Sequence, residues 1–137
     1  MKSHSVKAVA PATSANLGSG FDVFSVALDI LFDTVHAEMI DENRIEIRVE
    51  GPGGESIPVE PDLNTAGIVA KALLNLSKRK HGLKIKIEKG IRPGSGLGSS
   101  AASAAAAAVA AGAIAAGAIA AGRVAATPAA TATPPSV

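Results

Sequence analysis

The chain lacks cysteine, tryptophan and tyrosine, and three phenylalanines are the only aromatic residues among its 137 positions. Without cysteine it can form neither a disulfide framework nor a thiolate metal site, and this is compatible with the reducing cytoplasm, where we expect the protein. Because aromatic residues are few, the 47% hydrophobic content is largely alanine. Alanine buries little area, so the bulky core side chains must be the Ile, Val and Leu residues before Gly98.

Net charge is also small. The 13 Lys and Arg residues nearly balance the 12 Asp and Glu residues, for a formal charge of +1, and the lysines are scattered. Such a chain has no basic patch, which disfavours nucleic-acid binding. Residues 1–9 contain no continuous apolar segment, so we expect no secretory signal. The length allows one domain with a core but is short for an enzyme that encloses a nucleotide and a second substrate.

The most informative segment is residues 92–102, which read Arg-Pro-Gly-Ser-Gly-Leu-Gly-Ser-Ser-Ala-Ala. Its three glycines allow positive φ and a close approach of the backbone to a ligand, and its two adjacent serines stand where a helix would expose unpaired N–H groups. The segment therefore predicts a phosphate-binding loop. It matches neither the P-loop nor the dinucleotide pattern, and a flexible linker or a tight helix N-cap is the alternative.

Alternating apolar residues predict the strands. Residues 6–10 form a short strand ended by Pro11, and residues 12–20 form a loop. Residues 21–31 form either a short helix or an irregular connection. The alternations at 35–39 and 45–49 predict two antiparallel strands that pair around a turn at 41–43, with the charged residues 44–50 on a solvated face. Residues 51–61 form a surface loop.

The second half begins with a predicted amphipathic helix that is capped by Asn64 and ends before Gly82. Its predicted buried face comprises Ile68, Val69, Ala72, Leu73 and Leu76. A strand then places Leu83, Ile85 and Ile87 on one face, and it leads into the glycine loop and a further helix. This order indicates an α+β fold in which helices cover a mostly antiparallel sheet.

Residues 101–122 are almost entirely Ala, Gly, Val and Ile. A membrane span is one interpretation. We instead expect a soluble helix from Ser99 to about Gly112, because alanine favours helix and the run starts where the phosphate loop needs one. We therefore predict a domain at 1–112 and a frayed or disordered Ala/Gly/Pro/Thr tail at 113–137.

Two segments together resemble the GHMP small-molecule kinases. Residues 10–22 read Ala-Pro-Ala-Thr-Ser-Ala-Asn-Leu-Gly-Ser-Gly-Phe-Asp, and residues 93–102 form the second motif. The first motif is similar to that of the homoserine kinases, and residues 64–71 with the following strand resemble the archaeal form of these enzymes. The resemblance therefore covers roughly residues 5–105. The resemblance implies a ribosomal protein S5 domain 2-like fold for this N-terminal half, and ATP-dependent phosphorylation of L-homoserine in threonine biosynthesis. It also implies Mg²⁺ as a cofactor, a possible homodimer in the full-length family, and no nucleic-acid or membrane partner.

The resemblance also implies site residues. Asn16 and Asp22 would bind the amino acid, Asn64 would lie near the adenine, and Ser100 would help to bind Mg²⁺. The residues that would surround the ATP phosphates are Arg92, Pro93, Gly94, Ser95, Gly96, Leu97, Gly98, Ser99, Ser100, Ala101 and Ala102. Taken alone, Asp22 could be a helix cap and Asn16 a loop-stabilising residue. The three histidines have no ligand-like spacing.

The family segments expected after the loop, including a metal-binding glutamate and the C-terminal domain, have no counterpart here. After Glu88 the chain has no Asp or Glu. We therefore expect a truncated fragment, through a frameshift or gene-model error, that is inactive alone and leaves the apolar face of its sheet incompletely covered. A genuine shortened protein is the alternative to the frameshift. The alternative functions are those of another GHMP kinase, a non-catalytic nucleotide-binding module and a membrane-associated protein.

Overall fold

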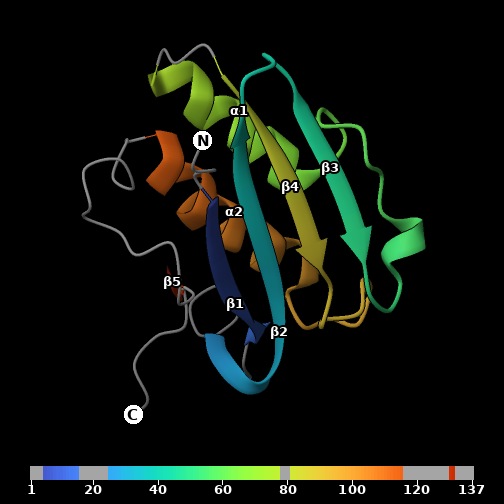
Figure 1. Cartoon of the computed structure of the whole chain (residues 1–137). Coiled ribbons are helices and arrows are strands. Elements are labelled where there is room, and N and C mark those ends of the chain that lie inside the picture. Colours follow the sequence, from blue (N-terminus) through green and yellow to red (C-terminus); the bar gives the residue numbers. More distant parts are fainter. Residues whose placement is uncertain (1–4, 16–24, 78–80, 116–129, 132–137) are drawn as a thin grey trace.

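The computed structural model describes residues 5–15, 25–77, 81–115 and 130–131 (Figure 1). Two helices pack on one face of a five-stranded sheet, which is the α+β fold predicted from the sequence. The elements in chain order are β1 (Ser5–Ala15), β2 (Ser25–Ile40), β3 (Ile45–Glu50), the 3₁₀ turn η2 (Gly54–Ser56), α1 (Thr65–Ser77), β4 (Gly82–Glu88), α2 (Ser99–Ala115) and β5 (Ala130–Thr131).

The sheet is mixed, with the strand order β3-β4-β2-β1-β5. The longer ladders, β1 with β2 and β2 with β4, are antiparallel, whereas β3 with β4 and β1 with β5 are parallel. The predicted pairing of β2 with β3 is wrong, because β4 lies between them (Figure 1). The alternation of apolar residues indicates which side of each strand faces the core. It cannot show that the chain, after α1, inserts β4 between the earlier strands β2 and β3.

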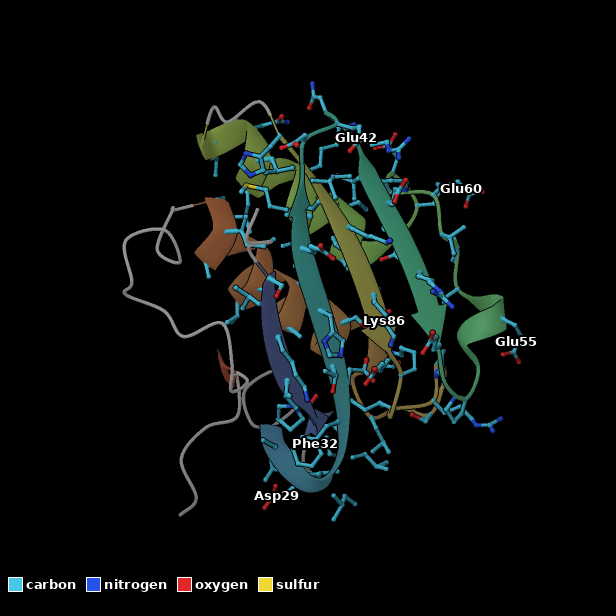
Figure 2. All side chains as sticks on the ribbon, in the orientation of Figure 1. Asp29, Phe32, Glu42, Glu55, Glu60 and Lys86 are labelled. Carbon is cyan, nitrogen blue, oxygen red and sulfur yellow. The ribbon has the colours of Figure 1, made fainter. Side chains whose placement is uncertain are left out.

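The first strand is longer than predicted. Pro11 does not end β1, which continues to Ala15, and its partner β2 begins at Ser25, within the segment for which the sequence allows either a helix or a connection. The pairing register shifts next to Pro11, which lies opposite Phe32, while Ala12 lies opposite Leu28. A bulge tolerates the missing N–H of proline, so the strand continues past it. Figure 2 shows Asp29 and Phe32 at the bend that β2 makes there.

The core lies between the sheet and the two helices. Leu83, Ile85 and Ile87 of β4 are at most 1% exposed, as the alternation predicted. Most apolar residues of β1, β2 and β4 that face the helices are buried, whereas Ile45, Ile47 and Val49 of β3 are only partly buried. Buried alanines on β1, β2 and α2 let the layers approach closely, and they are Ala8, Ala10, Ala12, Ala37, Ala102, Ala106, Ala107, Ala110 and Ala111.

The predicted buried face of α1 is wrong at three positions. Ile68 is 52% exposed and Leu76 is 79% exposed, and Ala72 is exposed as well. The buried positions are instead Ala66, Ala70 and Leu74. These are four residues apart and so lie on one side of α1, which packs against α2. The buried side of α1 is therefore rotated relative to the predicted one, and two of its three positions are alanine.

The other face of the sheet is charged, which confirms the solvated-face interpretation of residues 44–50. Lys86, which Figure 2 shows on this face, lies 3.6 Å from a carboxylate oxygen of Glu50 and 3.3 Å from one of Glu88. His36 Nε2 lies 3.3 Å from Glu88. Partial burial acts to raise the pKa of Glu88, but the hydrogen bonds and positive charges of Lys86 and His36 outweigh it and place that pKa below its ordinary value.

The final helix follows the predicted start. It begins at Ser99 and continues to Ala115, slightly beyond Gly112, and Ile114 and Ala115 are buried. Residues 113–115 of the predicted tail are thus helical, Ala130 and Thr131 pair with β1, and the rest of the tail lies outside the described residues. Within the described ranges, no helix combines the length and the apolar character needed to cross a membrane.

Candidate phosphate-binding site

The glycine loop adopts the backbone conformation that its sequence predicts. Gly94, Gly96 and Gly98 have φ values of 77°, 78° and 71°, the left-handed region that other residues adopt at a cost. A Cβ added at Gly94 or Gly96 would meet no other atom within 4 Å. The loop therefore presents bare main chain to open space at two of its three glycines, which is the arrangement that allows a ligand to approach backbone N–H groups.

The third glycine has a different role, because it contacts the end of β1. A Cβ at Gly98 would lie 2.2 Å from Oγ1 of Thr13, which is closer than atoms can approach. The Thr13 amide donates to the carbonyl oxygen of Leu97 at 2.9 Å. Thus the loop is packed against the strand that enters the first sequence motif. The predicted residues Asn16 and Asp22 in that motif lie outside the described residues.

The helix start is built as an anion site requires. The Ala102 amide donates to the carbonyl oxygen of Gly98 at 2.9 Å, which closes the first turn of α2. The earlier amides of the helix have no intrahelical acceptor, and the helix dipole adds partial positive charge at this end. Ser99 donates its hydroxyl to the carbonyl oxygen of Ile91 at 2.9 Å, whereas Ser100 is exposed.

A cavity of about 170 Å³ joins several predicted residues, which come from distant parts of the chain. Asn64, Pro93, Ser99 and Ser100 all line it. This volume is small beside a typical ligand pocket, so it would hold only part of a nucleotide. A larger, more open hollow of about 370 Å³ between β3 and α1 includes none of the predicted site residues.

Asn64 caps α1, as its sequence position predicted. Its Oδ1 accepts the amide of Ala66 at 2.9 Å, and its Nδ2 donates to the carbonyl oxygen of Pro58 at 2.8 Å. The residue is 2% exposed. Both polar atoms of its side chain are thus hydrogen-bonded within the chain. Any contact with the adenine base at this end of the cavity would therefore involve the neighbouring residues as much as Asn64.

The remaining predicted residues divide by exposure. Arg92, Ser95 and Ala101 are exposed, Pro93 and Leu97 are partly buried, and Ala102 is buried. Leu97 packs against the core. Leu97 and Ala102 therefore anchor the loop, whereas Arg92, Ser95 and Ala101 face solvent.

Sequence reasoning missed a buried charged cluster beneath the loop. Lys89 and Asp33 form an ion pair, with 4% and 0% of each residue exposed, and the Ser103 hydroxyl donates to Asp33 Oδ2 at 2.8 Å. Both charged residues could have been found, because each continues an inward-facing alternation: Asp33 precedes Val35 and Ala37, and Lys89 follows Ile85 and Ile87. A charged residue at an inward-facing position must be paired.

The described residues offer little to a metal ion. They contain no group of three or more His, Cys, Asp and Glu side chains that could hold one. Among the described residues that line the cavity, none is acidic, and both oxygens of the nearby Asp33 carboxylate already accept hydrogen bonds. Mg²⁺ prefers oxygen ligands and nucleotide phosphates supply them, so Ser100 could contribute one hydroxyl to an ion that the nucleotide brings.

Known proteins resemble this chain in sequence and in fold. Residues 64–131 match the family described as the GHMP kinases N terminal domain. The chain is 52% identical over 98 residues to the homoserine kinase of Methanococcus vannielii, covering 72% of this chain and 32% of that protein. It is 59% identical over 95 residues to that of Haloarcula marismortui, covering 69% and 30% respectively. The chain thus spans about a third of the length of the curated relatives it matches.

Solved structures agree with the sequence matches. The homoserine kinase from Cytophaga hutchinsonii superposes with a TM-score of 0.74 at 36% identity, over 80% of this chain and 35% of that one. Mevalonate diphosphate decarboxylase from Staphylococcus aureus gives a TM-score of 0.60 at 19% identity, over 80% and 36%, and shows a shared fold alone. These matches confirm the resemblance predicted from the two motifs.

Proposed function

We propose that residues 92–102 bind the triphosphate of ATP. The chain has the N-terminal fold of the GHMP kinases and resembles the homoserine kinases among them. The observation that carries this proposal is the run of three positive-φ glycines leading directly into α2, with open space in front of two of them. Backbone amides and a helix N-terminus bind anions without a charged side chain.

The reaction proposed for the whole enzyme is transfer of the terminal phosphoryl group of ATP to the hydroxyl of L-homoserine. Such a transfer depends mainly on positioning and on neutralising charge, which the loop amides and the start of α2 would supply here. When bound, Mg²⁺ neutralises charge on the phosphates, and Ser100 is the residue placed to contribute to it. Asn16 and Asp22 are proposed, from the resemblance, to bind the amino acid.

The position of the amino acid is supported by the contact between β1 and the loop. The Thr13 amide donates to the carbonyl oxygen of Leu97, so the described part of the first sequence motif lies beside the phosphate loop. A substrate held by this motif is therefore proposed to bind next to the phosphates. Asp22 is chemically suited to the ammonium group of an amino acid.

A second candidate is nucleotide binding without catalysis by this chain. It is favoured by the cavity lining, where none of the described residues is acidic. A kinase site normally holds its metal through at least one carboxylate. On this hypothesis the chain binds ATP but transfers no phosphate to homoserine.

The test is isothermal calorimetry with MgATP on a matched pair of variants, Gly96→Asn and Gly96→Asp. Both side chains tolerate the left-handed conformation and have the same shape, so their difference reports charge. We expect the Asp variant to bind at least about tenfold more weakly than the Asn variant at low salt, with a smaller difference at high salt. Equal affinities for the two variants would contradict phosphate binding at the loop.

A phosphoryl-transfer assay then separates the two candidates. It uses homoserine, with mevalonate as the alternative acceptor, and the wild-type chain. Turnover of homoserine supports the kinase function. ATP binding without turnover supports the non-catalytic candidate.

A further inference from the structure

A buried cluster of Lys89, Asp33 and Ser103 lies between the sheet and the phosphate loop, and the proposed phosphate contacts do not use it. Its members come from three elements: Asp33 from β2, Lys89 directly after β4, and Ser103 one turn into α2. At most 5% of each residue is exposed. Burying two charges and a hydroxyl is costly for a small domain, so the arrangement needs a reason.

Asp33 holds the segment that enters the loop. Its Oδ1 accepts the amides of Gly90 and Ile91, both at 3.0 Å. Its Oδ2 accepts from Lys89 and from the Ser103 hydroxyl. Since Gly90 and Ile91 are the last residues before Arg92, the carboxylate fixes the backbone immediately upstream of the loop.

Lys89 holds the segment that leaves the loop. Its ammonium donates to the carbonyl oxygen of Ser99 at 3.1 Å and to the Ser103 hydroxyl at 2.9 Å. Ser99 in turn donates its own hydroxyl to Ile91. The first turn of α2 is therefore tied to the same cluster, and the two ends of the loop are joined through it.

The charges of the cluster also matter to an anion. An isolated carboxylate at Asp33 would place a buried negative charge within one turn of the α2 N-terminus, where phosphates are proposed to bind. Lys89 cancels that charge and is itself among the residues that line the cavity. Buried charges are screened little by solvent, so this compensation affects an anion in front of the loop.

We propose that Asp33, Lys89 and Ser103 are positioning residues: they hold the two ends of the phosphate loop together, and Lys89 prevents the buried carboxylate from opposing phosphate binding. The proposal rests on the proposed function for its ligand. The loop-holding part of it can be tested without any ligand.

The experiment compares the full chain with Lys89→Met, with the double variant Lys89→Met/Asp33→Asn, and with Lys84→Met as the matched control. Lys84 is exposed on the opposite face of the same sheet. Amide hydrogen exchange by NMR is measured without ligand at Gly90, Ile91 and Ala102. Affinities for ATP and AMP are measured by calorimetry, at a temperature where circular dichroism shows each variant to be folded.

We expect faster exchange at Ala102 in Lys89→Met, because the first turn of α2 loses the hydrogen bond from Lys89 to Ser99, with no change in Lys84→Met. Because the uncompensated carboxylate repels phosphate charge, ATP affinity should fall about tenfold or more, and AMP affinity should fall less. The double variant keeps an oxygen that can accept both amides but removes the negative charge, so it should recover most of the ATP affinity. Equal losses for ATP and AMP, or unchanged exchange at Ala102 in Lys89→Met, would overturn the proposal.

Two further outcomes are kept distinct. If the wild-type chain binds neither nucleotide, the proposed function fails and the electrostatic part of the inference fails with it, while amide exchange still decides whether the cluster holds the loop. If Lys89→Met does not fold, Ser103→Ala takes its place, because it keeps both charges and removes one hydrogen bond to each. It should then raise exchange at Ile91 and Ala102, and unchanged exchange would overturn the loop-holding role.

Discussion

Replacing Gly98 with alanine tests the packing of the phosphate loop most sharply. Two costs add at this position. An alanine at a φ of 71° costs about 1–2 kcal/mol of stability. Its Cβ would also lie 2.2 Å from Thr13 Oγ1, so the strand or the loop must move, which costs about another 1–3 kcal/mol.

Two companion variants separate these costs. Gly96→Ala has a φ of 78° and no atom within 4 Å of its Cβ, so it should carry only the conformational cost of about 1–2 kcal/mol. In Gly98→Ala/Thr13→Ala the hydroxyl is gone, and the next contact with Thr13, that of its Cβ, is at an ordinary 3.5 Å. The double variant should therefore recover the steric part, with a coupling energy of about 1–3 kcal/mol.

The assay is urea unfolding of the four proteins, followed by circular dichroism, with Thr13→Ala measured alone to complete the cycle. The expected order of stability is wild type, Gly96→Ala, then Gly98→Ala, with the double variant above Gly98→Ala after correction for Thr13→Ala. If Gly98→Ala costs no more than Gly96→Ala, the loop does not pack against β1 as described. A coupling energy near zero would likewise contradict the contact between Gly98 and Thr13.

Three further predictions follow from single contacts. Gly112→Ala should stabilise the chain by about 0.5–1 kcal/mol in urea unfolding, because glycine is unfavourable within a helix and the new Cβ meets Leu73 at a comfortable 3.8 Å; a loss of stability would contradict the packing of α2 on α1. Asn64→Ala should destabilise by about 0.5–2 kcal/mol by removing the cap of α1, and no change in unfolding free energy would argue against the cap. The pKa of Glu88 is lowered in the folded chain, so its carboxylate stabilises the fold above its unfolded pKa, and that contribution is lost as pH falls through the folded pKa. The difference in unfolding free energy between wild type and Glu88→Gln, measured at neutral pH, should therefore disappear in acid. A difference that persists in acid would contradict the ion pairs.

The local structure was predictable where one residue type leaves few choices. Three glycines before two serines predicted both the positive φ values and the start of α2 at Ser99, and the alternation from Leu83 to Ile87 predicted the buried side of β4. Asn64 was predictable as a cap, because its side chain satisfies amides that every helix start exposes.

Features that depend on distant contacts were not predictable in this way. Nothing in the alternation of β3 shows that β4 separates it from β2, since strand neighbours depend on the crossover through α1. The prediction for α1 places Ile68 and Leu76 toward the core because they are large and apolar, whereas the buried side chains are those of Ala66, Ala70 and Leu74. The pairing of Asp33 with Lys89 joins residues 56 positions apart.

The central claim is that backbone amides of the glycine loop bind the phosphates of a nucleotide, and an NMR titration with MgATP tests it most directly. We predict saturable shifts of the Gly94, Gly96 and Ser100 amide signals, and shifts of the same amides with inorganic tripolyphosphate alone. Loop signals that stay in place while those of residues around the hollow between β3 and α1 move would contradict it.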